Sequence, residues 1–276
     1  MNVLSLFDGM ACGRIALERC GHKVDRYFAS EIDKYAMKVA KANYPDIEHL
    51  GDVRSVITDD LPDIDLLIGG SPCQGFSFAG RHLNFEDQRS RLFFEYVRIL
   101  EETQPRYFLL ENVRMSKESE RVISEFLDCE PITINSNLMS AQNRHRLYWT
   151  NISVDGLPDD KGIKLADIIE SGNVDRDKAH CIDANYWKGG NLKSYFEKNR
   201  RQLVFGESVD DYRKLSPIEC ERLQTVPENY TAHVSNTQRY KMLGNGWTVD
   251  VVAAIFKGID KFEFTQPGIN ATNMDG

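Results

Sequence analysis

The 276-residue chain lacks the features of a membrane-spanning, disulfide-bonded or zinc-ribbon protein. Its six cysteines are scattered without a C-x-x-C pair, which argues against a zinc ribbon and a disulfide framework, so we expect reduced thiols and no metal site. No apolar run approaches the roughly 20 residues that cross a bilayer, and no basic leader precedes the first strand-like run. We therefore expect a soluble, intracellular protein with no membrane partner.

Basic residues are in deficit, since 34 lysines and arginines face 42 aspartates and glutamates and leave a formal net charge of −8. Domains whose main role is nonspecific nucleic-acid binding usually carry a strong basic excess, so this balance argues against such a role. Local clusters such as Arg200-Arg201 can override the overall sign, although most clusters of this kind are solvated surface.

Proline-rich or serine-rich linkers and internal repeats are also absent, so we expect one large domain with a smaller lobe. Regular periodicity covers residues 1–150, fades over 151–212 and returns in helices over 213–264, and residues 265–276 are expected to form a disordered tail. Within the irregular stretch, residues 186–190 interleave aromatic and basic side chains.

Over the first 150 residues, short apolar runs alternate with segments of helical spacing, which predicts an α/β fold. The run Val3 to Phe7 leads into a glycine turn at 8–13 and then a helix, so free N–H groups would face a ligand. Two further runs end in the acids Glu31 and Asp52, and Glu31 follows the turn by roughly 20 residues, where a nucleotide ribose requires a carboxylate. The full G-x-G-x-x-G fingerprint is absent, and either acid alone would be as consistent with an ordinary surface residue.

A fourth apolar run ends in Gly69-Gly70 and presents Cys73 after a proline. A thiolate at the end of a strand is a candidate nucleophile, and it needs cationic or hydrogen-bonding neighbours that lower its pKa. A lone cysteine is more often a small buried residue, so the assignment depends on the rest of the chain.

Later segments supply a carboxylic acid and two cationic side chains that could accompany such a nucleophile. Glu111 lies near the end of the buried run 107–113, where open α/β sheets place their ligand sites and where an apolar setting would raise its pKa. Residues 141–149 alternate polar and apolar, which predicts a half-buried strand with Arg144 and Arg146 on the same face.

Several motifs occur in the order that is typical of one enzyme family, and the chain resembles the DNA (cytosine-5) methyltransferases over nearly its whole length. The motifs are Phe7-Asp8-Gly9 with Gly13, Pro72-Cys73-Gln74, Glu111-Asn112-Val113, Gln142-x-Arg144-x-Arg146, Arg213-Lys214-Leu215-Ser216-Pro217 with Glu219 and Arg222-Leu223-Gln224, and Gly244-Asn245. In detail the chain is most similar to the vertebrate de novo enzymes and their phage and bacterial relatives. Ala11-Cys12 departs from the Gly-Gly of most bacterial members.

The resemblance implies a Rossmann-like fold, with a doubly wound, mostly parallel sheet in the catalytic domain and a small target-recognition lobe at 151–212. Cys73 would add to carbon 6 of a flipped-out cytosine, so that carbon 5 can attack the methyl group of S-adenosylmethionine. Glu111 would hold the ring nitrogen and the exocyclic amine. Arg146 would hold the ring carbonyl, and Arg144 would support the loop and a neighbouring phosphate.

The resemblance also implies S-adenosylmethionine as cofactor, with S-adenosylhomocysteine as product. Its contacts would be Phe7, Asp8, Gly9, Met10, Cys12, Glu31, Ile32, Asp52, Val53, Pro72, Leu92, Asn245, Gly246 and Trp247. The nucleic-acid contacts would be Gln74, Ser77, Arg81, Lys188 and Arg213. The implied partners are double-stranded DNA and a cognate restriction endonuclease, in the cytoplasm of a bacterium or a phage-infected cell, where DNA binding would associate the protein with the nucleoid.

Three other functions remain open at the level of sequence. A transfer-RNA methyltransferase would keep the same catalytic motifs, and activity on duplex DNA against transfer RNA would separate the two. A catalytically silent DNA-binding relative would not need Cys73, Glu111 and Arg146 together. A nicotinamide oxidoreductase would explain the first two strands but would leave the cysteine and the arginine pair without a role.

Overall fold

The computed structural model describes residues 1–72 and 88–259, and its main element is a seven-stranded sheet in the order β3-β2-β1-β4-β5-β7-β6. The strands are β1 (Asn2–Leu6), β2 (Arg26–Ser30), β3 (Glu48–Gly51), β4 (Leu66–Gly69), β5 (Tyr107–Val113), β6 (Ile132–Asn135) and β7 (His145–Thr150). The first five are parallel, and β7 runs antiparallel to β5 and β6. The predicted mostly parallel α/β sheet is confirmed.

The strand order reverses between β1 and β4, because β2 and β3 lie on one side of β1 while β5 lies beyond β4. The register pairs Leu6 with Gly69, so the carboxyl ends of β1 and β4 lie side by side. Open α/β sheets bind ligands in the crevice that such a reversal creates. The glycine turn after β1 and the Gly69-Gly70 turn after β4 therefore open onto the same crevice.

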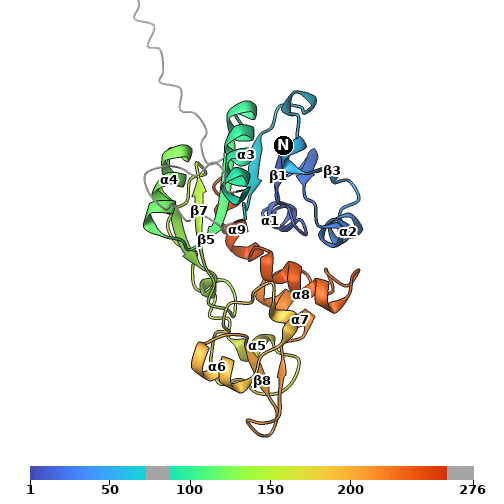
Figure 1. The fold of residues 1–276 in the computed structure, drawn as a ribbon, viewed down its shortest axis with the longest axis vertical. Helices are drawn as coiled ribbons and strands as arrows, with labels where there is room; N and C mark the ends of the chain where they lie inside the picture. Colours follow the sequence, from blue (N-terminus) through green and yellow to red (C-terminus); the bar gives the residue numbers. More distant parts are fainter. Residues whose placement is uncertain (73–87, 260–276) are drawn as a thin grey trace, which may run out of the picture.

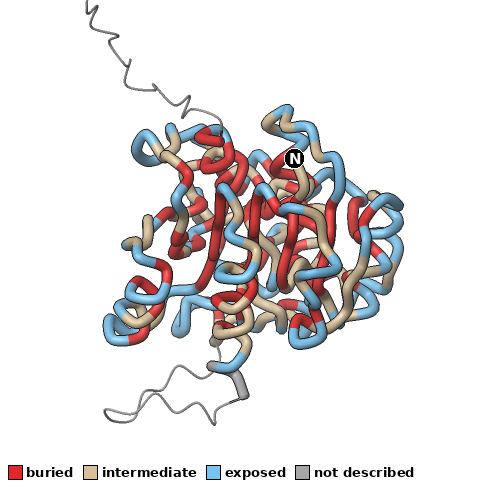
Figure 2. Tube along the Cα trace, turned by 90° about the horizontal axis from the view of Figure 1, so that it is seen from above, coloured by how far each residue is buried: buried red, intermediate tan, exposed pale blue. Residues whose placement is uncertain are grey.

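Helices cover both faces of the sheet, and each face has its own apolar cluster (Figures 1 and 2). Val3 of β1 belongs to the cluster that contains α1 (Cys12–Arg19), α2 (Lys34–Asn43) and α9 (Val249–Phe256). Leu4, its neighbour, belongs to the cluster that contains α3 (Gln88–Thr103) and α4 (Lys117–Leu127). Alternate residues of the central strands are thus buried on opposite faces, as expected of a sheet covered on both sides.

A smaller lobe lies below the sheet domain in Figure 1, with α7 (Pro217–Leu223) and α8 (Asn236–Asn245) between the two. The lobe contains α5 (Leu165–Ile168), η4 (Tyr186–Lys188), α6 (Leu192–Lys198) and a two-stranded sheet of β8 (Leu203–Phe205) and β9 (Tyr212–Lys214). Because Leu203 pairs with Lys214, the lobe's hairpin extends two residues past the expected boundary at 212.

Short 3₁₀ helices connect several elements. They are η1 (Val53–Ser55), η2 (Thr58–Asp60) and η3 (Ser136–Leu138). Over residues 1–72 and 88–259, no helix combines the length and the apolar character that crossing a membrane requires.

Candidate active site

A cleft of about 880 Å³ opens at the carboxyl ends of the parallel strands. All the residues that the resemblance assigned to the cofactor line it, together with Glu111, Arg144 and Arg146. They come from the turn after β1, the ends of β2, β3, β4 and β5, helix α3, and the segments next to α8 and β7. A volume of this size suits a small-molecule cofactor and part of its substrate.

The turn after β1 has an unusual backbone, since Phe7, Gly9 and Ala11 all have left-handed φ values, of 57°, 62° and 65°. A residue with a Cβ atom in this conformation costs about 1–2 kcal/mol, so neighbouring groups must hold the turn. Glu31 supplies one such contact, because its Oε2 accepts a hydrogen bond of 2.8 Å from the Gly9 N–H. The other oxygen of Glu31 accepts bonds from the N–H groups of residues 32 and 33, each 2.7 Å long.

Asp8 presents a buried carboxylate to the cleft. Its Oδ1 accepts a 2.7 Å hydrogen bond from the Tyr27 hydroxyl, while its Oδ2 is buried without a hydrogen-bond partner in the described part of the protein. Burial raises the pKa of Asp8 to about 7, although hydrogen bonds from Ser5 and Tyr27 act in the opposite direction. The sequence did not identify Tyr27 as a partner of this turn.

Asp52 lies between β3 and η1 and is the N-cap residue of η1. Its side chain accepts a hydrogen bond from the Arg54 backbone N–H. The Arg54 guanidinium also donates to both carboxylate oxygens, with its Nε 3.0 Å from Oδ1. These hydrogen bonds lower the pKa of Asp52 to about 2. Asp52 is therefore an anion and a hydrogen-bond acceptor at neutral pH.

Glu111, near the end of β5, is buried and has two partners from distant segments. Arg146 of β7 places its Nε 2.9 Å from Oε1, and Trp247, beyond α8, donates from its Nε1 to Oε2 over 3.1 Å. The antiparallel register pairs Val113 with Arg146, which puts Arg146 diagonally across from Glu111 on one sheet face. Burial raises the pKa of Glu111 above its ordinary value, against the effect of the positive charges of Arg146 and Arg144.

Arg144 lies just before the strand in which the sequence placed it. Strand β7 begins only at His145, so the predicted strand at 141–149 starts too early, whereas Arg144 and Arg146 both line the cleft. Arg144 is 2% exposed, and its guanidinium donates to the backbone carbonyls of Ile182, Gly244 and Gly246 over 2.9, 3.1 and 2.8 Å. Arg144 thus joins the small lobe to the C-terminal end of α8.

The contact between these two segments is close. A Cβ atom on Gly244 would lie 2.1 Å from the carbonyl carbon of Asp183, so only glycine fits where α8 meets the lobe.

The residues assigned to nucleic acid are only partly described. Cys73, Gln74, Ser77 and Arg81 lie outside the described residues, and the chain is described up to Pro72, which lines the cleft. Lys188 is exposed, with its ammonium 5.4 Å from the centre of the Trp187 ring. Arg213 is partly exposed, and its guanidinium donates to both carboxylate oxygens of buried Glu219 over 2.7 and 2.8 Å.

The structure also brings residues to the cleft that the sequence did not indicate. Lys241 of α8 forms a 2.8 Å ion pair with Asp33, the residue that caps α2, and both line the cleft. Helix α8 was not predicted, because its sequence is polar overall. The spacing of Tyr240 and Leu243, which are buried on one face, is the signal that could have revealed it.

Comparison with known proteins identifies the family. The model of the C-5 cytosine-specific DNA methylases matches residues 1–157 and 161–261. A Type II methyltransferase of Lactococcus lactis subsp. cremoris, M1.ScrFI, is 32% identical over 92% of this chain and 76% of its own length. M.NlaX of Neisseria lactamica, also a Type II methyltransferase, is 29% identical over 92% of this chain and 94% of its own length.

Solved structures show the same fold. The S. pombe Dnmt2 methyltransferase superposes with a TM-score of 0.71 at 20% identity, covering 93% of this chain and 97% of that protein. The Entamoeba histolytica methyltransferase EhMeth gives 0.74 at 17% identity, covering 94% and 97%. The chain therefore belongs to the C-5 cytosine-specific DNA methylase family and is a methyltransferase of that class. The resemblance drawn from the motifs is confirmed, and the nicotinamide oxidoreductase interpretation has no support.

The raised pKa of Asp8 predicts how the stability of the protein depends on pH. An aspartate in the unfolded chain ionises near 3.8, whereas folded Asp8 keeps its proton up to about 7. The stabilisation from neutral Asp8 is thus complete below pH 4 and is lost as the pH rises to 7. In Asp8→Asn, the free energy of unfolding should fall less over this range than in the wild type. Urea unfolding at a series of pH values, without cofactor, measures this difference, and an unchanged pH dependence would show that Asp8 is ionised in the folded protein.

Proposed function

We propose that this protein transfers a methyl group from S-adenosylmethionine to carbon 5 of cytosine in double-stranded DNA, through a covalent adduct at Cys73. The observation that supports this most directly is the composition of the cleft. One end carries the strand-end acids Glu31 and Asp52, and the other carries Glu111 with Arg146. The cofactor and the cytosine would thus meet in a single cavity.

The acids of the cleft match the donors of S-adenosylmethionine. The unpartnered Oδ2 of Asp8 would accept from the ammonium group of the methionine part. Glu31, held in place by three backbone N–H groups, would accept from the ribose hydroxyls. Asp52 would accept from the adenine amino group, and Ile32, which is 74% exposed, would cover the adenine ring. When bound, the cofactor supplies the methyl group as a substituent of an electrophilic sulfonium.

The side chains of this protein would prepare the cytosine. Carbon 5 is a poor nucleophile, so the Cys73 thiolate adds to carbon 6 and raises the electron density at carbon 5. Glu111 holds the ring nitrogen and the exocyclic amine, and burial shifts its pKa upward, in the direction that favours transfer of a proton to the ring nitrogen. Arg146 donates to the ring carbonyl. Once carbon 5 carries the methyl group, a base removes its proton, the electron pair of that C–H bond restores the ring double bond, and the thiolate leaves carbon 6.

The cytosine must flip out of the DNA double helix for this chemistry. Carbon 6 and carbon 5 are inaccessible to a thiol inside a stacked duplex, and flipping a base out costs a few kcal/mol of stacking and pairing. The family description favours DNA over transfer RNA as the substrate. Because the relatives named above are Type II methyltransferases, we also infer a restriction–modification role beside a cognate endonuclease.

We assign the chemistry to residues 1–150 with the C-terminal helices, and target recognition to the lobe that starts at 151 and includes the β8–β9 hairpin. Two observations support the lobe's assignment. Trp187 is 40% exposed, beside exposed Lys188, while the neighbouring Tyr186 is buried and bonded to the backbone of residues 202 and 215. A lobe of this size reads few bases.

The covalent route predicts a trapped complex. After bisulfite sequencing of plasmid DNA from expressing cells has identified the target, a duplex with 5-fluorocytosine at that site should, with S-adenosylmethionine, give an adduct stable to denaturing gel electrophoresis. Fluorine cannot leave as a proton, so the thiol stays bound. Cys73→Ser should abolish the trap, because a hydroxyl supplies almost no anion near neutral pH.

Matched variants identify the nucleophile. Cys12→Ser, Cys20→Ser, Cys181→Ser and Cys220→Ser should all still form the trapped complex. Trapping by the Cys73→Ser protein, or its loss only when one of the other cysteines is changed, would remove Cys73 from the mechanism.

Target recognition by the lobe predicts a change in specificity. Trp187→Ala with Lys188→Ala should slow methylation of the target sequence by about tenfold or more, since a single base contact or stack is worth about 1–3 kcal/mol. Sequencing of methylated plasmid libraries measures both rate and sequence. The control is Ile57→Ala, which removes a side chain of 62% exposure from the large domain. Identical sequence preferences and rates in the double variant and the control would contradict this assignment.

A further inference from the structure

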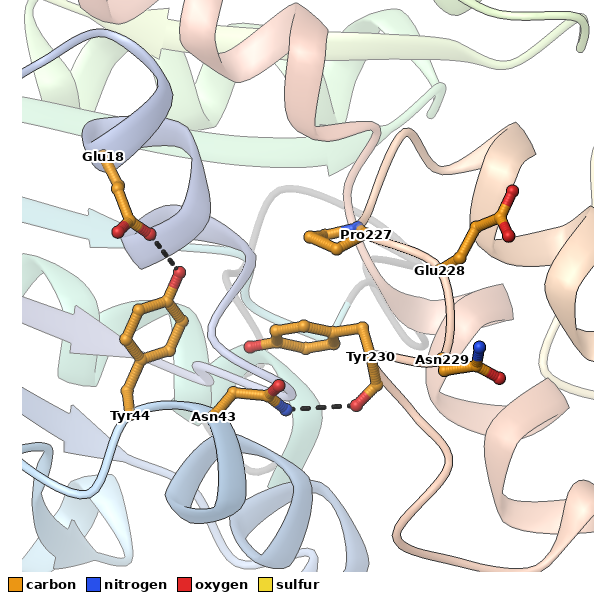
Figure 3. A pocket seen from close by; sticks show the side chains of 7 residues that line it. All are labelled: Glu18, Asn43, Tyr44, Pro227, Glu228, Asn229 and Tyr230. Atoms are coloured by element: carbon orange, nitrogen blue, oxygen red, sulfur yellow. Dashed lines mark hydrogen bonds between the residues drawn. The ribbon is translucent and has the colours of Figure 1, made fainter.

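A second, smaller pocket lies between α1, the end of α2 and the segment that follows α7 (Figure 3). It is next to the turn Phe7–Ala11 that follows β1, which we call the cofactor turn. Its volume is about 280 Å³. It is lined by Glu18, Asn43, Tyr44, Pro227, Glu228, Asn229 and Tyr230. Figure 3 shows the Tyr230 side chain extending from its own segment toward the N-terminal elements.

Tyr230 forms a direct contact with the cofactor turn. Its hydroxyl donates a 2.7 Å hydrogen bond to the backbone carbonyl of Met10, and both residues are buried. Met10 stands between Gly9 and Ala11, two of the three left-handed residues of the turn. The Tyr230 hydroxyl therefore holds the turn at Met10, while Glu31 holds it at the neighbouring Gly9 by accepting from its N–H.

The segment that carries Tyr230 is itself fixed on both sides. The buried carboxylate of Glu221 accepts from the N–H of Asn229 over 2.7 Å and from the N–H of Thr231 over 2.9 Å. The amide of Asn43 on α2 donates to the Tyr230 carbonyl over 3.0 Å. Neighbouring residues are thus anchored before and after Tyr230, so its hydroxyl has a defined position.

We propose that Tyr230 is a positioning residue for cofactor binding, which acts by holding the turn Phe7–Ala11 in its left-handed conformation without touching the cofactor. This inference rests on the proposed function. Phe7 and Ala11 carry Cβ atoms and disfavour the left-handed region, so the turn keeps this conformation only while its surroundings over-determine it. Removing the hydroxyl also leaves the buried Met10 carbonyl without this donor.

Tyr230→Phe removes only the hydroxyl and tests the proposal. Its affinity for S-adenosylhomocysteine, measured by isothermal titration calorimetry, should fall about three- to tenfold, as expected for one lost hydrogen bond. The KM for S-adenosylmethionine should rise by the same factor, while kcat at saturating cofactor stays at the wild-type value. Without cofactor, hydrogen exchange at the amides of residues 8–12 should be faster than in the wild type.

Tyr44→Phe is the matched control. Its hydroxyl lines the same pocket but donates to Glu18 Oε2 over 2.6 Å and not to the turn. Tyr44→Phe should keep wild-type affinity for S-adenosylhomocysteine and wild-type exchange at residues 8–12. Equal losses in the two variants would mean that any damage to this pocket weakens binding, and would overturn the proposal.

The failure of this inference differs from the failure of the proposed function. A wild-type protein that does not bind S-adenosylhomocysteine would overturn the proposed function and, with it, the role of Tyr230 in cofactor binding. A wild-type protein that binds, with Tyr230→Phe unchanged in affinity and in exchange at residues 8–12, would overturn the inference alone.

Discussion

The buried carboxylate of Glu111 is the group on which the rest of the site depends. A buried charge is stable only with partners, and removing one partner of such a pair typically costs about 3–5 kcal/mol. Both partners come from later in the chain, Arg146 from β7 and Trp247 from the segment after α8. The C-terminal segment must therefore return to the sheet for the centre to exist, and a fold of the first 150 residues alone would leave half of this environment missing.

The segment that carries Trp247 is fixed by a buried polar network. Gln224 donates from its Nε2 to the carbonyls of Leu243 and Gly246 over 2.6 and 3.1 Å, and it accepts from Gln142 over 2.9 Å. Arg144 bonds two carbonyls of the same segment. Amides and a guanidinium from distant elements thus satisfy backbone carbonyls at the C-terminal end of α8, and they fix the indole that bonds Glu111.

Much of the site followed from sequence because parallel strands end at one edge of a sheet. Glu31, Asp52 and Glu111 each follow or end an apolar run, so the order of runs and acids was sufficient to predict their shared cleft. The strand predicted at 141–149 began too early because alternation of polar and apolar residues does not show where a strand begins. The bond from Tyr230 to Met10 joins positions 220 residues apart, and no local pattern reports such a pair.

Arg144 binds three main-chain oxygens, those of residues 182, 244 and 246, and the sulfur of Cys181, which lies 3.3 Å from its Nη1. Every amino acid carries the same carbonyl, so Cys181 is the lobe side chain to which this guanidinium bonds in the described part of the protein. Other parts of the lobe are attached through buried side chains, such as the Tyr186 ring that packs on Tyr240 of α8, and these cannot vary freely. The attachment thus leaves the exposed side chains of the lobe, Trp187 and Lys188 among them, free to change while the cleft stays constant.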